Sequence, residues 1–131
     1  MDLTMYSVSL FALVSMAALM LVQIVVNDVA GIKRRKIPGT MVEQSHRDFL
    51  FRASRTVANT NDVAVVFLML VLANIFLTAN PVYLAIATWS FVSARMTYSL
   101  CYYANWQSAR SASFGIGLIA LGALVITALW F

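Results

Sequence analysis

Two sets of polar residues interrupt an otherwise apolar chain, and both have the spacing of one helix face. The first set is spaced i, i+3, i+7 and i+10, which confines it to an arc of about 80° on an α-helix: Arg52, Arg55, Asn59 and Asp62. The second set repeats that spacing: Arg95, Tyr98, Tyr102 and Asn105. Two such stripes on neighbouring helices would face each other and define a site.

The residue types in these stripes favour the binding of an anion. The guanidinium of arginine stays charged when partly buried, and it binds carboxylates and phosphates through two hydrogen bonds. We expect Asp62 to pair with Arg95, but the cations near the predicted site outnumber this one carboxylate: Arg52, Arg55, Arg95 and Arg110. A small ligand with carboxylates would supply the missing negative charge. The same cations would lower the pKa of a bound thiol and so stabilise its thiolate.

The alternative interpretation is that these polar groups only hold helices together. Polar contacts between transmembrane helices are common and contribute about 0.6 kcal/mol each. An ionisable residue inside a membrane, however, costs at least about 2.5 kcal/mol. Several arginines and tyrosines converging near one interface exceed what helix packing requires, which favours a binding site.

The elements that carry these stripes are predicted to be four membrane-spanning helices. Hydrophobic residues make up 62% of the chain and the mean hydropathy is +0.84, so the solvent is expected to be lipid. Three runs are nearly free of charged residues: residues 5–26, 63–79 and 112–131. A fourth run, residues 81–106, contains Arg95 as its one charged residue. The sequence therefore predicts an all-α integral membrane protein, a single domain over residues 1–131. It is expected to be an up-and-down bundle of four transmembrane helices at about 4–30, 45–78, 82–105 and 110–130.

Positive charge is gathered on one side of this arrangement. The nine Lys and Arg residues lie in the first connection, in the first turns of the second helix, and toward the second cytoplasmic connection. By the positive-inside rule this side is cytoplasmic and both termini lie opposite, in a bacterial inner membrane or a membrane of the endoplasmic reticulum type. The net charge of +4 suits anionic lipid headgroups, whereas no basic and aromatic module for nucleic acid is present.

Small residues and single reactive residues are expected to have structural roles. The last helix carries small side chains suited to close packing against a neighbour: Ser113, Gly117, Ala120 and Gly122. Cys101 is the only cysteine and His46 the only histidine, so neither a disulfide nor a metal site can be built from them. We expect Cys101 to be inert packing and His46 to be solvated.

The run Arg52-Ala-Ser-Arg55-Thr-Val-Ala-Asn59-Thr-Asn-Asp62 resembles the signature of the MAPEG family, the membrane-associated proteins of eicosanoid and glutathione metabolism. That family carries Arg-x-x-Arg-Ala-His-x-Asn-x-x-Glu at this place. The run Ala94-Arg95-Met-Thr-Tyr98-Ser-Leu-Cys-Tyr102 and the pair Arg110-Ser111 look like its third helix and the start of its fourth. The resemblance covers most of the chain from Arg47 onward.

The resemblance implies a homotrimer that binds glutathione between neighbouring subunits. It implies a glutathione-dependent transferase or peroxidase that acts on hydrophobic, membrane-dissolved electrophiles by thiolate attack. Arg110 and Ser111 would stabilise the thiolate. The resemblance also implies ligand binding by Arg55, Asn59, Asp62 and Tyr102 and, from the first connection, by Lys33 or Arg35. The two polar stripes add Arg52, Arg95 and Tyr98 to the predicted ligand-binding residues.

Three positions depart from the family's pattern and leave an alternative open. Val57 replaces the family's histidine, Ala58 replaces a frequent arginine, and Tyr98 replaces a histidine that contacts ligand in some members. Fewer cations therefore remain to hold glutathione. The alternative is a non-catalytic lipid-binding or scaffold protein, like the branch of the family that activates a lipoxygenase. A small multidrug transporter ranks last, because the first helix has no acidic residue near its middle.

Overall fold

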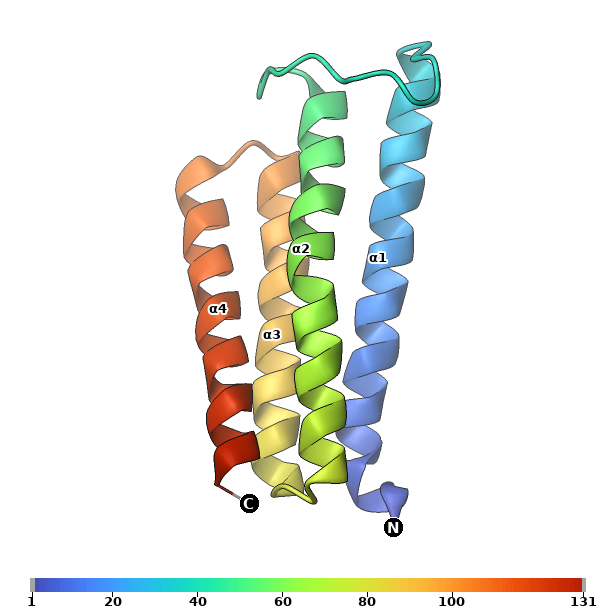
Figure 1. The fold of residues 1–131 in the computed structure, drawn as a ribbon. Helices are drawn as coiled ribbons and strands as arrows, with labels where there is room; N and C mark the ends of the chain where they lie inside the picture. The colour runs from blue at the N-terminus through green and yellow to red at the C-terminus, as the bar shows by residue number, and fades with distance from the viewer. Residues whose placement is uncertain (1, 131) are drawn as a thin grey trace.

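The computed structural model describes residues 2–130, which form four long antiparallel helices after one short 3-10 turn (Figure 1). Both termini lie at the same end of the bundle, opposite the long connection between the first two helices (Figure 1). The elements are η1 (Leu3–Tyr6), α1 (Ser7–Lys33), α2 (Phe49–Phe76), α3 (Pro81–Tyr103) and α4 (Gln107–Leu129). The predicted all-α fold with four long helices is confirmed.

The helix boundaries differ from the prediction by a few residues. α2 begins at Phe49 instead of residue 45, because the side chain of Asp48 accepts a hydrogen bond from the backbone N–H of Leu50 and caps the helix there. α1 continues to Lys33, and α4 already begins at Gln107. The α1–α2 connection is therefore longer, and the α3–α4 connection shorter, than predicted.

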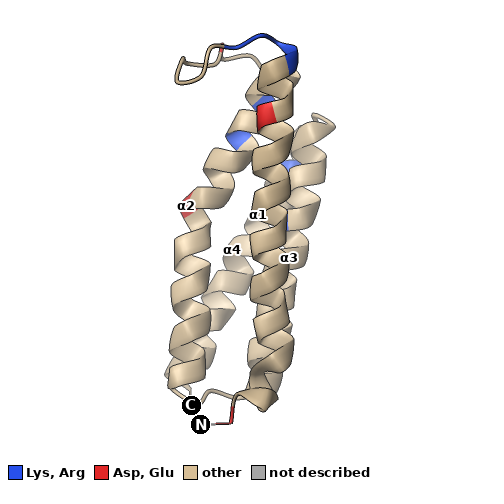
Figure 2. Ribbon diagram, turned by 90° about the vertical axis from the view of Figure 1, so that its right-hand side faces the viewer, with Lys and Arg blue, Asp and Glu red and all other residues tan. Residues whose placement is uncertain are grey.

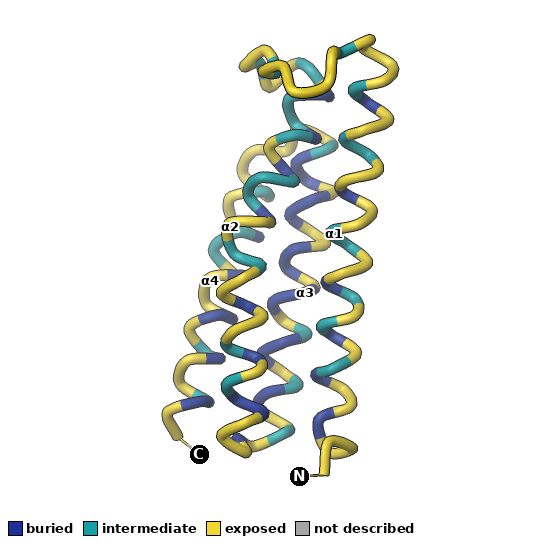
Figure 3. The backbone as a smooth tube through the Cα atoms, turned by 45° about the vertical axis from the view of Figure 1, so that its right-hand side comes forward, coloured by how far each residue is buried: buried dark blue, intermediate teal, exposed yellow. Residues whose placement is uncertain are grey.

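Three helical stretches of the described chain are long and apolar enough to cross a membrane: Leu3–Lys33, Phe49–Phe76 and Gln107–Leu129. α3, predicted as the remaining span, is not among them, since it carries several polar side chains, among them Thr88, Arg95 and Ser99. Buried residues are concentrated along α3, whereas α1, α2 and α4 expose many large apolar side chains (Figure 3). Apolar side chains that face outward suit contact with lipid tails. The chain is an integral membrane protein.

The interior combines tight apolar packing with polar bridges between helices. Phe67 of α2 stacks on Phe91 of α3, with ring centroids 4.4 Å apart. Gln23 of α1 donates a hydrogen bond to the hydroxyl of Ser99 at 2.6 Å. Asn74 of α2 donates to the carbonyl of Leu124 in α4 at 3.0 Å. These bridges tie all four helices together where lipid offers no partner for a polar group.

Three helices end in the same tight motif, with a residue other than glycine in the left-handed conformation. Arg35, Thr78 and Asn105 have φ angles of 53°, 55° and 60° and follow α1, α2 and α3. At each end, two backbone N–H groups close back onto carbonyls of the last turn, the pattern of a Schellman motif. After α2 and α3 the chain thus reverses within a few residues, which sets the next helix antiparallel, whereas a longer connection follows the same motif after α1.

Replacing Thr78 by glycine is expected to stabilise the bundle. The left-handed conformation costs an L-residue about 1–2 kcal/mol, and glycine avoids this cost. Glycine also loses more conformational entropy on folding, so a net stabilisation of about 0.5–1 kcal/mol should remain. Reversible unfolding in mixed detergent micelles measures the change. Thr127→Gly inside α4 is the matched control and should destabilise by about 1 kcal/mol. A loss of stability for both variants would contradict the prediction.

Candidate functional site

A polar hollow lies between α2, α3 and α4, toward the end of the bundle that carries the basic connection. Its volume is about 240 Å³, and it is lined by Asn59, Tyr98, Arg110, Ser111 and Phe114. Four of these five residues were predicted from the sequence as site residues. Lys and Arg gather at this end of the molecule (Figure 2).

Asn59 and Tyr98 are the points at which the two predicted stripes meet. The side-chain amide of Asn59 donates a hydrogen bond to the hydroxyl oxygen of Tyr98 at 2.7 Å. Arg55, one turn earlier on α2, donates a long hydrogen bond of 3.4 Å to Asn59 Oδ1. Asn59 therefore links the exposed guanidinium of Arg55 to the buried phenol of Tyr98, and Asn59 and Tyr98 both line the hollow.

Arg95 lies beneath Tyr98 instead of lining the hollow. Its side chain is 1% exposed, and its Cζ atom lies 4.1 Å from the centroid of the Tyr98 ring. Its Nη2 donates to the hydroxyl of Thr60 at 2.8 Å, while its Nε has no hydrogen-bond partner among the described residues. The guanidinium is therefore held by a hydroxyl and a ring face, and its charge stays uncompensated.

The predicted ion pair between Asp62 and Arg95 is wrong. Asp62 is exposed, and the one ion pair within 4 Å among residues 2–130 joins Arg34 to Asp48. Thr60 and Asp62 are about 160° apart around α2, so only one of them can face α3. Thr60 takes that place because Asn59, its neighbour in sequence, already contacts Tyr98.

Thr60→Val is expected to destabilise the protein while keeping the shape of the side chain. Removing the hydroxyl leaves the buried Arg95 without its hydrogen-bond acceptor, a change that costs about 1–3 kcal/mol. The stability of the purified protein in detergent measures it. Thr97→Val on the exposed face of α3 is the control and should change stability by less than about 0.5 kcal/mol. Equal effects of the two substitutions would count against the role of Thr60.

Arg110 stands over a second tyrosine at the edge of the hollow. Its Cζ atom lies 4.5 Å from the centroid of the Tyr102 ring, and the Tyr98 and Tyr102 rings are 5.6 Å apart. Tyr102 is buried, whereas Ser111, which follows Arg110 in α4, is exposed. The Tyr102 ring thus supports the guanidinium of Arg110, which lines the hollow together with the hydroxyl residue Ser111. This arrangement can bind and stabilise an anion.

The other predicted site residues do not line this hollow. Arg52 donates to the backbone carbonyl of His46 at 2.6 Å and lies 5.5 Å from the Phe49 ring centroid, so it holds the start of α2. Lys33 lines a separate apolar hollow beside α1, and Arg35 is the left-handed residue that ends that helix. Within one chain, these three cations are not brought to Arg110.

Sequence reasoning missed three residues around the site. Phe114 completes its wall, Thr60 accepts the hydrogen bond from Arg95, and His46 lies against aromatic rings, 6.1 Å from that of Tyr102. The position of Phe114, one turn after Arg110 on the same face of α4, is a signal that could have identified it. Nothing in the spacing of the sequence pointed to His46, because the irregular α1–α2 connection positions it.

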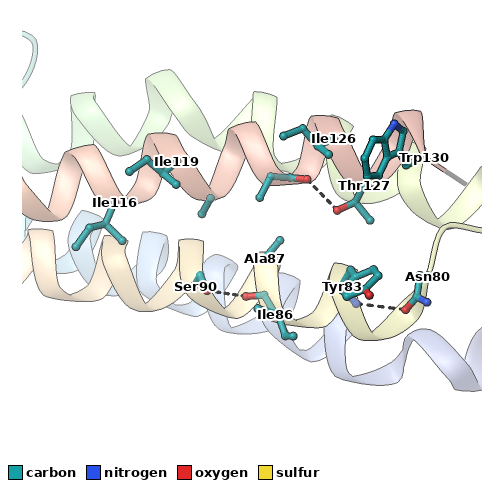
Figure 4. Close-up of a pocket in the computed structure, with 12 residues that line it drawn as sticks. Asn80, Tyr83, Ile86, Ala87, Ser90, Ile116, Ile119, Ile126, Thr127 and Trp130 are labelled. Atoms are coloured by element: carbon teal, nitrogen blue, oxygen red, sulfur yellow. Dashed lines mark hydrogen bonds between the residues drawn. The ribbon is translucent and has the colours of Figure 1, made fainter.

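A larger apolar groove runs along α3 and α4 toward the end where the termini lie. Its volume is about 570 Å³, and it begins at Ser90 and Ile116 and reaches Asn80 and Trp130. Figure 4 shows side chains from both helices facing each other across it, with Tyr83 and Trp130 at one end. The polar hollow and the apolar groove are therefore both lined by α3 and α4, but they lie at different levels along the length of the bundle.

A comparison with models of known protein families finds that the model of the MAPEG family matches residues 4–130, nearly the whole chain. The chain belongs to the MAPEG family. The match extends over all four helices, and it includes both the polar hollow and the apolar groove. MAPEG members are membrane proteins and include glutathione transferases and peroxidases along with other members. A comparison with curated protein sequences returns no match.

Proposed function

We propose that this MAPEG protein is a glutathione-dependent transferase or peroxidase that acts on hydrophobic electrophiles dissolved in the membrane. One observation carries the proposal: Arg110 and Ser111 line the same hollow as Asn59 and Tyr98. No carboxylate forms an ion pair with Arg110 or Arg95 within the part of the chain that the structure describes. An anionic ligand with a thiol would balance this charge.

The chemistry follows from the charge in the hollow. Arg55 and Asn59 bind polar ends of glutathione, and Arg110 with the hydroxyl of Ser111 stabilises its thiolate after the thiol proton has passed to water. The thiolate sulfur then forms a bond to the electrophilic carbon, and the leaving group departs with the bonding electrons. In a peroxidase reaction, two glutathione molecules reduce one hydroperoxide to an alcohol and water and become a disulfide.

A neighbouring copy of the chain is proposed to complete the site. The hollow of about 240 Å³ is smaller than typical ligand pockets of about 300–1,000 Å³, and it is open on one side. In a homotrimer, Lys33 or Arg35 of the partner subunit would supply the further cation that a glutathione carboxylate requires. Asp62, exposed on α2, would face the same interface and accept from the ligand's ammonium group.

The groove on α3 and α4 is proposed as the route of the hydrophobic acceptor. It is lined mainly by apolar side chains, and the helices that form it also carry Tyr98 and Arg110. In the proposed topology all four helices cross the bilayer, with the basic connection cytoplasmic and both termini opposite. Glutathione would then enter from the cytoplasm and the acceptor from lipid.

The second candidate is a lipid-binding scaffold protein without catalysis. The observation that favours it is the size of the apolar groove, about 570 Å³, against about 240 Å³ for the polar hollow. A scaffold of this kind would retain a lipid in the groove and show no thiol chemistry. Lipid retention would then be insensitive to changes at Arg110.

The test is conjugation of 1-chloro-2,4-dinitrobenzene to glutathione by the purified protein in lipid nanodiscs. The proposal expects turnover above the uncatalysed reaction and saturation with glutathione. Reduction of cumene hydroperoxide in a parallel assay separates the peroxidase from the transferase. A folded oligomer that binds no glutathione and accelerates neither reaction would overturn the proposal in favour of the scaffold.

A further inference from the structure

One face of α2 carries a polar amide that the rest of the chain leaves exposed. Asn61 is exposed near the middle of the helix, which begins at Phe49 and ends at Phe76. α2 has 28 residues and is therefore about 42 Å long, so a hydrocarbon core of about 30 Å includes Asn61 wherever along the helix that core begins. Lipid tails offer a carboxamide neither a donor nor an acceptor. Another protein surface is therefore needed to cover this face.

Asn61 belongs to a stripe with the spacing of a coiled-coil seam. Steps of four and three residues alternate along α2 through six positions, which confines all six to an arc of about 80°. The stripe consists of Ser54, Ala58, Asn61, Val65, Leu68 and Leu72. All six are exposed or half-buried in the chain. A repeat of this period suits packing along the whole helix against identical helices.

A neighbouring stripe of the same spacing is less suited to such a seam. It passes through Arg55, Asp62 and Met69. Copies of Arg55 that met at one axis would repel one another. Arg55 also donates to Asn59, which lines the polar hollow, so this flank of α2 belongs to the proposed glutathione site. Asp62 lies about 100° around the helix from Asn61, and the seam and the glutathione site can therefore occupy different flanks.

The side chains around Asn61 on the stripe suit close contact between helices. Ser54 and Ala58, which precede it, are small residues of the kind that let helix backbones approach each other in membranes. Leu68 and Leu72, which follow it, are exposed apolar side chains that can pack against their own copies. Close backbones on the side of Ser54 and Ala58 would bring the amides of neighbouring copies within reach of one another.

We propose that Asn61 forms a ring of three carboxamides on the axis of the homotrimer, and that this ring selects which chains assemble. Each amide donates a hydrogen bond to the Oδ1 atom of the next copy and accepts one from the previous copy, because a carboxamide carries both donors and an acceptor. The partner that fits is a chain with an amide at the same depth. A chain with leucine there leaves the amides of its neighbours unpaired. This inference rests on the homotrimer proposed above, but not on the glutathione chemistry.

Co-expression of the wild type with a differently tagged Asn61→Leu chain tests the selection. Leucine keeps the branched shape of asparagine and removes its donors and acceptor. Random assembly of equal amounts would make about three quarters of the trimers mixed. Each hydrogen bond of the ring is expected to favour assembly by about threefold or more, so the mixed share should fall to about half or less. Native mass spectrometry counts the tagged copies in each oligomer, and a mixed share of about three quarters would overturn the role of Asn61.

Val65→Leu is the matched control for this experiment. It changes apolar packing one turn further along the same stripe and removes no hydrogen-bonding group. Co-expressed with the wild type, it should give mixed trimers as about three quarters of the total. If Val65→Leu sorts as strongly as Asn61→Leu, apolar packing decides assembly and the proposed ring is contradicted.

Cysteine cross-linking tests the position of the seam with Asn61 left in place. In a Cys101→Ser background, which removes the only native thiol, Leu68→Cys should form disulfide-linked dimers on oxidation in the membrane. Met69→Cys, about 100° further around α2, should form far fewer. Any result in which Leu68→Cys does not cross-link more than Met69→Cys would place Asn61 outside the seam and overturn the proposal. Both experiments measure assembly alone, so their failure is distinct from a failure of the conjugation assay.

Discussion

Arg110→Ala is expected to lower kcat/KM for glutathione conjugation by about 100- to 1,000-fold, the range found when one preorganised donor to a developing anion is removed. Arg110 is the cation that lines the hollow directly, and its position over the Tyr102 ring fixes its direction. Without it, less of the bound glutathione would be thiolate at neutral pH. Most of the loss should appear in kcat, measured with 1-chloro-2,4-dinitrobenzene at saturating glutathione.

The matched control is Arg47→Ala, which removes an equal charge from the α1–α2 connection outside the hollow. It should keep kcat/KM within about twofold, since surface charges in this position are screened by salt. Spectroscopic titration of the thiolate in the presence of each variant gives an independent readout. If Arg110→Ala retains full activity and thiolate, Arg110 is not the stabilising group.

Gly117→Leu is expected to separate α3 from α4 and to lower stability by about 1–3 kcal/mol, the usual cost of overpacking. A Cβ atom at Gly117 would already lie 3.9 Å from side-chain atoms of Phe91, Ala94 and Arg95. A leucine has three further carbons, which would have to push these contacting side chains apart. Since the two helices carry Tyr98 and Arg110, glutathione binding should fall together with the midpoint of unfolding.

Gly122→Leu provides the control on the same helix. No atom lies within 4 Å of a Cβ placed at Gly122, which is exposed, so the change should be within about 0.5 kcal/mol. The sequence reasoning had grouped Gly122 with the packing residues, and that assignment is wrong. Gly122 lies on a different face of α4 from the buried residues of that helix, which include Ser113, Gly117, Ala120 and Leu124. Equal destabilisation by both leucines would contradict this account.

Much of the candidate site was predictable because helical spacing alone determines which residues share a face. Asn59 and Tyr98 were assigned to two facing stripes, and a hydrogen bond joins them. Arg110 and Ser111 line the same hollow as these two residues. The roles of these residues in binding glutathione remain predictions, as do those of Lys33 and Arg35.

The partner of Arg95 was not predictable, because charge alone suggested Asp62. Which residue of α2 faces α3 depends on how far each helix is rotated about its axis, and this is set by packing along its whole length. The stack of Phe67 on Phe91 and the bond from Asn59 to Tyr98 favour a rotation that turns Thr60 inward. A neutral hydroxyl then meets the guanidinium, and Asp62 is left exposed.

By itself, the sequence determined the number of helices, their order and the grouping of positive charge at one end. These features are local, since each apolar run must satisfy its own backbone hydrogen bonds in lipid and therefore becomes a helix. Only the tertiary structure decided which polar groups meet across the bundle and which hollows they line. The reversal at Arg35 that sets Lys36 beside α1, and the rotation of α2 that buries Thr60, both depend on contacts between segments distant in sequence.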